Sequence, residues 1–473
     1  MIPPTADGGL CDGSPYAVVM KILRVVETAA IRRPCPHLFG PSVVRGGVAS
    51  RIANMFSPWK PLIYLPSFFV GIRKSSMASD GKMLMYCLKL VLMTLAVSIG
   101  LYAGLLAALT NRFVQTHAVY LHAFQMTGGK DLNTPEMFGF LRGQVTPFIV
   151  HSPDGTTLHS WHILPIGLYR EHMAELMQQP TGLVTDVATG LGFELLRDDP
   201  DALLTIHFHG AGGNMGSGYR IPNYRALAAG NPDKIHVLTF DYRGFGKTPG
   251  VPTEQGLIQD AVAVVDWALN VANIPPSRIL IFGQSLGTAV NMAVADHFAS
   301  LEKPVIFAGH VLIAPFVDVP SLVTTYRIAG RIPILSPVAR YTRLFNLLSS
   351  QIRETWSTKT RIAAYVRRSE ATLNKYRITL IHAEDDSSIP WQHTSALFWN
   401  AANATSAEGL GTDEMETWRL DESQVIGAAG SVAHWRTDHG TISEYIVKYG
   451  LHDVVMGAPI VSLAAMRIFD EDR

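Results

Sequence analysis

One serine of this chain has the neighbours that a nucleophilic serine needs, in the segment Gly283-Gln284-Ser285-Leu286-Gly287. The segment directly follows an apolar run that favours a strand, Arg278–Phe282, and opens a helical pattern over Leu286–Ala299. On such a tight turn the hydroxyl is lifted out of the sheet, the two glycines leave room for neighbouring backbone, and the helix N-terminus favours negative charge. We therefore predict that Ser285 attacks acyl carbonyl groups. The alternative is an ordinary turn, because a chain with 40 glycines can contain such a pentapeptide by chance.

A glycine-rich loop is the second chemical signal, in His207-Phe208-His209-Gly210-Ala211-Gly212-Gly213-Asn214. Acyl transfer needs N–H donors, fixed in advance, that stabilise the oxyanion of the tetrahedral intermediate. We predict that the backbone N–H groups of Ala211 and Leu286 are these donors. One alternative is a metal site at His207 and His209, for which no third ligand is evident. Another is a phosphate-binding loop, which would end in Lys-Ser or Lys-Thr. No metal or cofactor is expected.

An acidic loop is the third signal, in His382-Ala383-Glu384-Asp385-Asp386-Ser387-Ser388-Ile389-Pro390, directly after the strand-like run Arg377–Ile381. A carboxylate at the end of a strand can orient a histidine and stabilise its charged form. Asp386 fits this role best. Asp385 or Glu384 could take the role instead, and a merely solvated acidic loop is the remaining alternative.

The histidine of such a set is expected after the acid, because serine, acid and histidine follow in this order when the serine lies on a strand-to-helix turn. The histidines beyond Asp386 are His393, His434, His439 and His452. His393 is close to the acid and begins a helical pattern. His452 follows the strand-like run Ile442–Tyr449 and precedes a helical pattern around Val461–Phe469, which puts it on the last loop of the catalytic edge. We predict that His452 is the general base; a surface or core position is the alternative for any one of the 17 histidines.

The elements that must position these residues alternate between strands and helices. The strand-like runs are Gln144–Val150, Thr157–Leu164, Leu203–Phe208, Ile235–Phe240, Arg278–Phe282, His310–Ile313 and Arg377–Ile381. The helical patterns are Thr253–Asn270, Leu286–Ala299 and Gln392–Ala402. This alternation predicts an α/β fold, a mostly parallel doubly wound sheet with crossover helices. Residues 315–376, basic and mostly helical in pattern, predict a cap inserted into the sheet topology.

A membrane span is predicted at Leu90–Leu109, which carries no charge and has the length of about 20 residues that a spanning helix needs. A buried core helix is the alternative, but soluble helices rarely run so long without a polar face. A cleaved signal peptide is not expected, because the apolar segment begins far from Met1. We assign residues 1–82 to a flexible basic tail, 83–110 to a transmembrane signal anchor and 111–473 to the catalytic domain.

The charges beside the span predict its orientation. The basic residues that precede it are Arg73, Lys74, Lys82 and Lys89, whereas only Arg112 follows closely. The positive-inside rule then places the N-terminus in the cytosol and the catalytic domain on the lumenal or outer side.

Composition excludes several classes of protein. The 39 lysines and arginines balance the 39 aspartates and glutamates, so there is no electrostatic reason to expect a nucleic-acid partner. All three cysteines, Cys11, Cys35 and Cys87, lie in the first 90 residues, so the remainder holds no disulfide, thiol nucleophile or cysteine zinc site. A channel or transporter is not expected from a single span without charge.

The stretch from about Leu203 to Phe469 resembles α/β-hydrolase-domain lipases. It is most similar to the membrane-anchored branch that hydrolyses monoacylglycerols and lysophosphatidylserine in the endoplasmic reticulum. The matching segments are Asp241-Tyr242-Arg243-Gly244-Phe245-Gly246, Asp266-Trp267, Gly283–Gly287, Leu380–Pro390, and His452 with Pro459. The single anchor before the hydrolase domain also matches that branch.

The resemblance implies the α/β-hydrolase fold, with a catalytic triad of Ser285, Asp386 and His452. The chain departs from that branch at Gln284, where histidine is common, and after His209-Gly210, where it has Ala-Gly-Gly-Asn. The resemblance does not extend to residues 1–82.

We therefore expect an endoplasmic-reticulum membrane enzyme that cleaves a lipid ester, such as a monoacylglycerol or a lysophospholipid, through an acyl-enzyme. The first alternative is a protein or acyl-CoA thioesterase with the same chemistry. The second is a catalytically inactive membrane scaffold of the same fold, although a scaffold has no need to keep all three residues in order.

Overall fold

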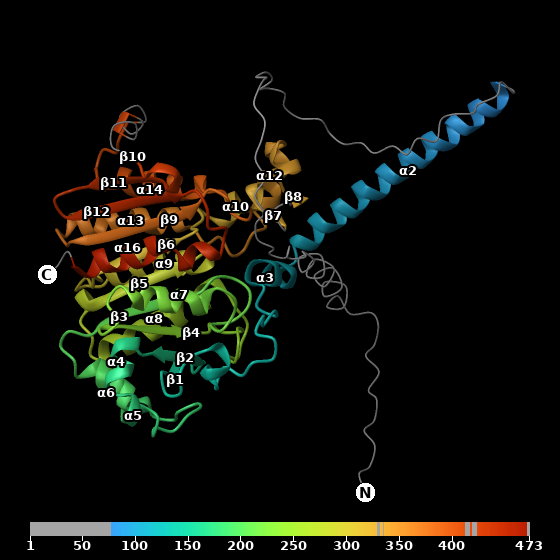
Figure 1. The fold of residues 1–473 in the computed structure, drawn as a ribbon. Coiled ribbons are helices and arrows are strands. Elements are labelled where there is room, and N and C mark those ends of the chain that lie inside the picture. Colours follow the sequence, from blue (N-terminus) through green and yellow to red (C-terminus); the bar gives the residue numbers. More distant parts are fainter. Residues whose placement is uncertain (1–76, 329–331, 334, 412–416, 419–422, 471–473) are drawn as a thin grey trace, which may run out of the picture. The chain divides into compact units, whose positions relative to one another are not determined.

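A ten-stranded sheet forms the centre of Leu106–Arg473, which is one of two compact units in the chain; the other is Met1–Leu105 (Figure 1). The computed structural model describes residues 77–328, 332–333, 335–411, 417–418 and 423–470. Residues 1–76 of the predicted tail therefore lie outside the described residues, and residues 77–82 belong to helix α2 (Met77–Leu109).

The strands of the large sheet run in the order β1-β2-β4-β3-β5-β6-β9-β12-β11-β10. Their bounds are β1 Val145–His151, β2 Thr157–Ile163, β3 Leu203–Phe208, β4 Ile235–Phe240, β5 Ile279–Gln284, β6 Gly309–Ile313, β9 Tyr376–Ala383, β10 Gln424–Val425, β11 Gly430–Arg436 and β12 Gly440–Val447. The six central strands, β4, β3, β5, β6, β9 and β12, run parallel to one another. The strands at the two sides of the sheet, β1, β2, β10 and β11, pair antiparallel. The prediction of a mostly parallel α/β sheet is thus confirmed.

The helices of the second unit that cover the sheet or extend from it begin with α3 at Arg112. Their bounds are α3 Arg112–Tyr120, α4 Ile166–Glu171, α5 Met173–Leu176, α6 Leu191–Arg197, α7 Arg220–Ala229, α8 Glu254–Asn270, α9 Leu286–Ala299, α10 Val319–Thr325, α11 Ser336–Ala339, α12 Thr342–Ser349, α13 Thr358–Ala371, α14 Gln392–Asn403 and α16 Pro459–Asp470. The three predicted helices begin and end within one residue of the bounds of α8, α9 and α14, because each has a clear local signal. For example, the Thr253 hydroxyl caps α8 by accepting from the N–H of Gly256.

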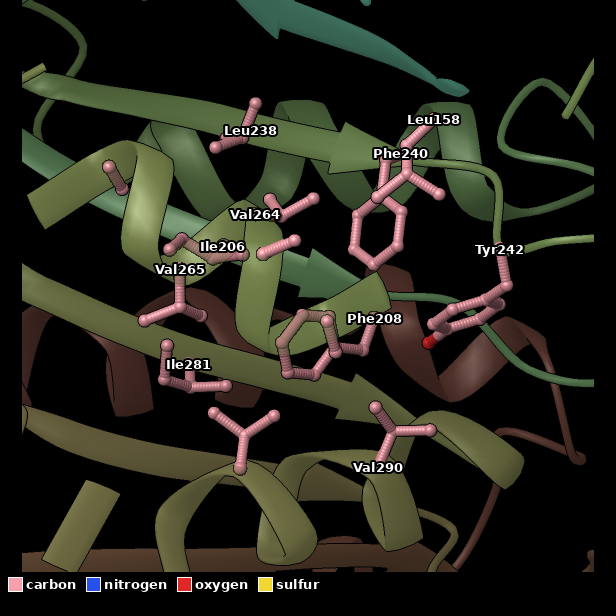
Figure 2. Packing of buried hydrophobic residues seen from close by; sticks show 14 of the residues in the cluster. Leu158, Ile206, Phe208, Leu238, Phe240, Tyr242, Val264, Val265, Ile281 and Val290 are labelled. Carbon is pink, nitrogen blue, oxygen red and sulfur yellow. The ribbon is translucent and has the colours of Figure 1, made fainter. Parts of the chain in front are cut away.

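Helices cover both faces of the sheet, which explains why the central parallel strands are buried along their whole length. Side chains of α8 and α9 pack on one face of β3, β4 and β5; Figure 2 shows Val264 and Val290 among those that meet Ile206, Phe208 and Ile281. Helices α7 and α16 pack on the opposite face. Each fully buried aliphatic or aromatic side chain stabilises the fold by about 1.5–3 kcal/mol.

The predicted cap, residues 315–376, contains two different parts. One part leaves the sheet layers and consists of α10, the short strands β7 (Arg327–Ile328) and β8 (Ile332–Pro333), α11 and α12. The other part is α13, whose Ile362, Tyr365 and Val366 are buried with residues of α9 and α14. The spacing of these apolar residues gives α13 one face for the core, so this helix lies in the layer that covers the sheet.

One helix in the described part of the chain is long and apolar enough to cross a membrane, over Gly81–Leu109 within α2. It contains the predicted span Leu90–Leu109 and extends it toward the N-terminus. Its side chains are exposed, which would be unfavourable in water for so many apolar residues.

Candidate active site

The predicted nucleophile Ser285 lies between β5 and α9, at the carboxyl end of a central parallel strand. Its backbone has a φ of 52° and a ψ of −118°, a combination that a residue with a Cβ rarely adopts. The turn is held from both sides: the Ser285 N–H donates to Ile313 O at 2.9 Å, and the Thr288 hydroxyl donates to Ser285 O at 2.6 Å. Strained backbone that the surrounding structure holds in this way often marks a functional site.

The two glycines of this turn are required by close backbone contacts. A Cβ at Gly287 would lie 2.0 Å from the carbonyl oxygen of Phe208, the last residue of β3. A Cβ at Gly283 would lie 2.4 Å from the carbonyl oxygen of Gly287. The absence of these side chains therefore lets the serine turn pack directly against the start of the glycine-rich loop.

The structure brings Asp386 and His452 together. Asp386 Oδ2 lies 2.7 Å from His452 Nδ1, although the residues are 66 positions apart. Asp386 follows β9 and His452 follows β12, and these strands are parallel neighbours. Because parallel strands end at the same edge of a sheet, both residues lie at the carboxyl edge to which Ser285 also belongs.

Further contacts hold the Asp386 carboxylate in place. Its Oδ1 accepts from the N–H groups of Ser388 at 2.8 Å and Ile389 at 3.0 Å. Its Oδ2 also lies 3.1 Å from Nε2 of His382, whose Nδ1 contacts the Thr394 hydroxyl at 2.6 Å. The carboxylate thus has a fixed position and is shared by two imidazoles.

The neighbouring acids have other partners. Glu384 pairs with Lys448 in an ion pair that is about one-third to one-half exposed. Asp385 Oδ1 accepts from the N–H groups of Gly450 at 2.9 Å and Leu451 at 2.8 Å. Leu451 has a φ of 49°, so Asp385 holds a strained turn immediately before His452.

Asp386 and His452 each shift the pKa of the other in the direction that favours its charged form. Burial by itself would raise the pKa of Asp386, but its hydrogen bonds with His382 and His452 hold the pKa well below the ordinary value. Burial by itself would lower the pKa of His452, but the hydrogen bond and negative charge of Asp386 raise it above the ordinary value. The pair therefore favours an ionised carboxylate and a basic imidazole.

One hydrogen bond joins the serine turn to the histidine loop. Gln284, directly before Ser285, donates through Nε2 to Oδ1 of Asp453, directly after His452, at 3.2 Å. The same Gln284 side chain lies against the glycine-rich loop, since a Cβ at Gly210 would be 2.2 Å from its Oε1. The serine turn, the loop that carries His452 and the glycine-rich loop therefore adjoin one another around Gln284.

The glycine-rich loop (residues 210–217), which we call the oxyanion loop after its predicted role, is fixed by a buried arginine. Arg220, at the start of α7, donates through Nη2 to Gly210 O at 2.9 Å and to Gly212 O at 2.7 Å, and through Nη1 to Asn214 O. A trans peptide points its C=O and N–H in opposite directions. Because Gly210 O faces Arg220, the N–H of Ala211 points away from it.

A second group of contacts joins the oxyanion loop to the chain between α2 and β1. We call residues 112–125 the connecting segment. Its backbone carbonyls accept from the loop: Tyr120 O from Gly212 N–H at 2.8 Å, and Phe124 O from Gly213 N–H at 2.7 Å. The part of the chain that directly follows the apolar helix is therefore also part of the site's support.

The sequence profile of the alpha/beta hydrolase family matches residues 203–459, which is more than half of the chain. The chain belongs to the alpha/beta hydrolase family. The matched range contains Ser285, Asp386 and His452, together with the oxyanion loop.

Several known members of this family are similar to the chain. Lysophosphatidylserine lipase ABHD12 of Danio rerio is 26% identical over 300 residues, covering 63% of this chain and 68% of that protein. Protein ABHD12B of Homo sapiens is 28% identical over 201 residues, covering 42% of this chain and 50% of that protein. The crystal structure of an alpha-beta hydrolase from Vibrio vulnificus is similar with a TM-score of 0.45 and 13% identity, covering 74% of this chain and 92% of that one.

Three residues support this hydrolase site in ways that the sequence motifs do not predict. Arg220, Asp385 and His382 each hold a backbone or carboxylate group of the predicted machinery. Asp385 was weighed only as an alternative acid. For His382, its place in the segment His382–Pro390 was a usable signal, whereas Arg220 has no motif, because its partners are carbonyl oxygens that every residue carries.

Proposed function

We propose that this hydrolase is a membrane-anchored serine esterase that cleaves single-chain lipid esters, such as monoacylglycerols or lysophospholipids. Ser285, Asp386 and His452 form its catalytic triad in this proposal. The observation that carries it is the 2.7 Å contact between Asp386 Oδ2 and His452 Nδ1, beside the strained turn that holds Ser285.

The proposed reaction uses each of these groups once. His452 Nε2 accepts the proton of the Ser285 hydroxyl as Oγ bonds to the ester carbonyl carbon. The oxyanion accepts hydrogen bonds from the N–H groups of Ala211 and Leu286. His452 then returns the proton to the leaving alcohol, and a water molecule, activated in the same way, releases the fatty acid from Ser285.

Geometry supports the assignment of the two oxyanion donors. Leu286 is the first residue of α9, where N–H groups have no partner within the helix. Ala211 N–H points away from Arg220, and the backbone just before it packs on Gly287 of the serine turn. The two donors thus come from adjoining loops at one edge of the sheet.

The substrate class rests on the relatives and on the apolar helix. The relatives in fish, bird and frog are named lysophosphatidylserine lipases and are 25–26% identical to this chain. An anchor of the length of Gly81–Leu109 would hold the enzyme beside lipid substrates. The basic residues Lys82 and Lys89 favour a cytosolic N-terminus and a lumenal hydrolase domain, and we propose the endoplasmic reticulum as its location.

Two serine variants of the full chain, made in microsomes, test the chemistry. We expect Ser285→Ala to lose both labelling by a fluorophosphonate probe and hydrolysis of monoacylglycerol and lysophospholipid. Ser300→Ala is the matched control, because this exposed serine directly follows α9 and its hydroxyl donates to His297 O, so it should keep both activities. Full labelling of Ser285→Ala would show that the proposed mechanism is wrong, and no labelling of the wild type would indicate an inactive scaffold.

Protease treatment of sealed microsomes tests the orientation. A lumenal hydrolase domain is protected until detergent is added. Digestion without detergent would place the domain in the cytosol and would favour a protein or acyl-CoA thioesterase instead.

A further inference from the structure

Helix α12, in the part of the cap that leaves the sheet layers (Figure 1), has an apolar side that is exposed among the described residues. Tyr341, Leu344 and Leu347 are 68%, 43% and 62% exposed, and Phe345 and Leu348 are half-buried. Positions 341, 344, 345 and 348 have the spacing of one helix face, and Leu347 borders it. Adjoining exposed apolar side chains of this kind mark a surface that another apolar phase contacts.

A buried glutamine joins the segment that follows α12 to Leu109, within the second compact unit of the chain. Gln115 Nε2 donates to Leu109 O at 2.9 Å and to Gln351 O at 2.8 Å, and Gln115 Oε1 accepts from the Arg353 N–H at 3.1 Å. Leu109 is the last residue of α2, and Gln351 lies two positions after the end of α12. One side chain therefore joins the last turn of the apolar helix to the chain that leaves α12.

The composition of α12 fits a lipid surface better than a protein surface. Arg340 and Arg343 are exposed beside the apolar face, as expected where basic side chains meet lipid headgroups. Tyr341 has an apolar ring and a polar hydroxyl, a combination that favours the membrane interface. The bilayer that holds Gly81–Leu109 would also end near Leu109, so the same bilayer lies within reach of α12.

We propose that α12 lies in the membrane interface with Tyr341, Leu344 and Leu347 inserted among the lipid headgroups and upper acyl chains. This inference rests on the proposed membrane anchoring and lipid hydrolysis. The cap also contacts the chain that follows the Asp386 loop, since the hydroxyl of Thr325, the last residue of α10, lies 3.0 Å from Nε2 of His393. A single-chain lipid would enter from the bilayer surface beside α12.

Fluorescence quenching of the full chain tests the insertion directly. Cys11, Cys35 and Cys87 are replaced by serine, and an environment-sensitive dye is attached at Leu347→Cys, at Asn346→Cys on the polar side of α12, or at Leu373→Cys. Leu373 is the matched control, because it is also 68% exposed but lies at the end of α13. Each protein is placed, one copy per disc, in phosphatidylcholine nanodiscs that carry a nitroxide near the top of the acyl chain.

We expect the nitroxide to reduce the fluorescence at position 347 at least about twofold, since interfacial helices insert only to the upper acyl chains. The reduction should be smaller at 346 and negligible at 373. An equal fractional reduction of fluorescence at positions 347 and 373 would overturn the proposal. Quenching that appears only when a disc holds two copies would overturn it in favour of a contact between chains.

A double variant tests the consequence for substrate entry. Leu344→Ser with Leu347→Ser should reduce hydrolysis of monoacylglycerol in vesicles about tenfold and leave hydrolysis of a soluble short-chain ester unchanged, because only the first substrate comes from the bilayer. An unchanged ratio of the two activities would overturn the role in entry. If the wild type hydrolysed neither ester, the proposed function would fail, while the quenching result would still decide whether α12 inserts.

Discussion

The Asp386 loop and the oxyanion loop lie at the same edge of the sheet, but they are held in different ways. Among the described residues, Asp386 takes most of its contacts from residues within four positions of the chain, together with the distant His452. The oxyanion loop is held by Arg220 and by the connecting segment, whose Tyr120 lies about ninety positions away. The first loop is therefore held mainly by local contacts, whereas the second depends both on the nearby Arg220 and on a segment about ninety positions away.

This difference predicts two kinds of variant. Changes in the Asp386 loop should remove chemistry, and their effect on stability should stay local to that loop. Changes around the oxyanion loop should affect both position and stability, because the same contacts that aim its N–H groups also hold distant segments together.

Asp386→Asn should have the largest effect on the reaction. The amide keeps the shape of the side chain but loses the negative charge that orients and stabilises His452, and a change of this type reduces kcat about 10⁴-fold in serine hydrolases. The measurement is kcat for a soluble ester at a temperature at which circular dichroism shows the variant to be folded, because the lowered pKa of Asp386 means that its ionised form also stabilises the domain.

Glu384→Gln is the matched control in the same loop. Its partnership with Lys448 is a largely exposed ion pair, which contributes about 0–1 kcal/mol. A loss of activity at Glu384 as large as that at Asp386 would mean that the general negative charge of the loop, rather than the contact with His452, is what matters.

Arg220→Met should have the next largest effect. It leaves the carbonyls of Gly210, Gly212 and Asn214 without their buried donor, so the peptide that carries Ala211 N–H is free to rotate. Loss of one oxyanion donor reduces kcat about 10²–10³-fold, and the loss of these buried hydrogen bonds also lowers the stability of the domain, although Asn214 O keeps the Ser217 N–H.

The control for Arg220 is Arg225→Met on the same helix. Arg225 is exposed and donates to Gly139 O, far from the oxyanion loop along the chain. Activity is compared at a temperature at which circular dichroism shows both variants to be folded. A folded Arg220→Met protein with wild-type kcat would remove the distinction between the two loops.

The pH dependence of kcat/KM tests whether Asp386 acts on the reaction through His452. Asp386 raises the pKa of His452 above its ordinary value, and a general base must be unprotonated to accept the serine proton. We expect kcat/KM to rise with pH along a limb whose midpoint lies above about 6.5, falling about tenfold per pH unit below it. Residual activity in Asp386→Asn should show this midpoint at lower pH; an unmoved midpoint would assign the limb to another group.

The sequence made most of the parallel core and the motif-bearing loops predictable, because their signals are local. The strands from β3 to β6 appear as short apolar runs, and the serine turn is marked by Gly283 and Gly287, which close contacts require. The 2.7 Å contact between Asp386 and His452 agrees with the predicted pair, although their catalytic roles stay predictions.

Other features could not be predicted, because they depend on contacts between distant segments. Strand β11 (Gly430–Arg436) lies in a segment rich in small residues and forms by pairing with β12. Helix α13 resembles the cap in composition and is placed by its packing against α9 and α14. The role of the connecting segment depends on backbone carbonyls, which carry no sequence signal.

Tyr120→Phe should have the smallest effect and tests the connecting segment itself. The Tyr120 hydroxyl accepts from Trp356 Nε1 at 3.2 Å and donates to Glu354 Oε2 at 3.1 Å. It therefore joins the connecting segment to the part of the cap between α12 and α13. Trp356 is fully buried, and leaving its indole N–H without an acceptor should lower the stability by about 1–3 kcal/mol.

The backbone carbonyl of Tyr120, which holds Gly212, is unchanged in this variant. We therefore expect a lower unfolding midpoint in nanodiscs with only a few-fold change in fluorophosphonate labelling, whereas Tyr449→Phe, at an exposed tyrosine, should change neither. A loss of labelling as large as that of Arg220→Met would show that the oxyanion loop depends on the cap as well as on the segment next to the apolar helix. In that case the position of the oxyanion loop would depend on a chain of contacts that runs through Tyr120 to Trp356 and Glu354. The oxyanion loop and the Asp386 loop would then differ even more in how far along the chain their supports lie.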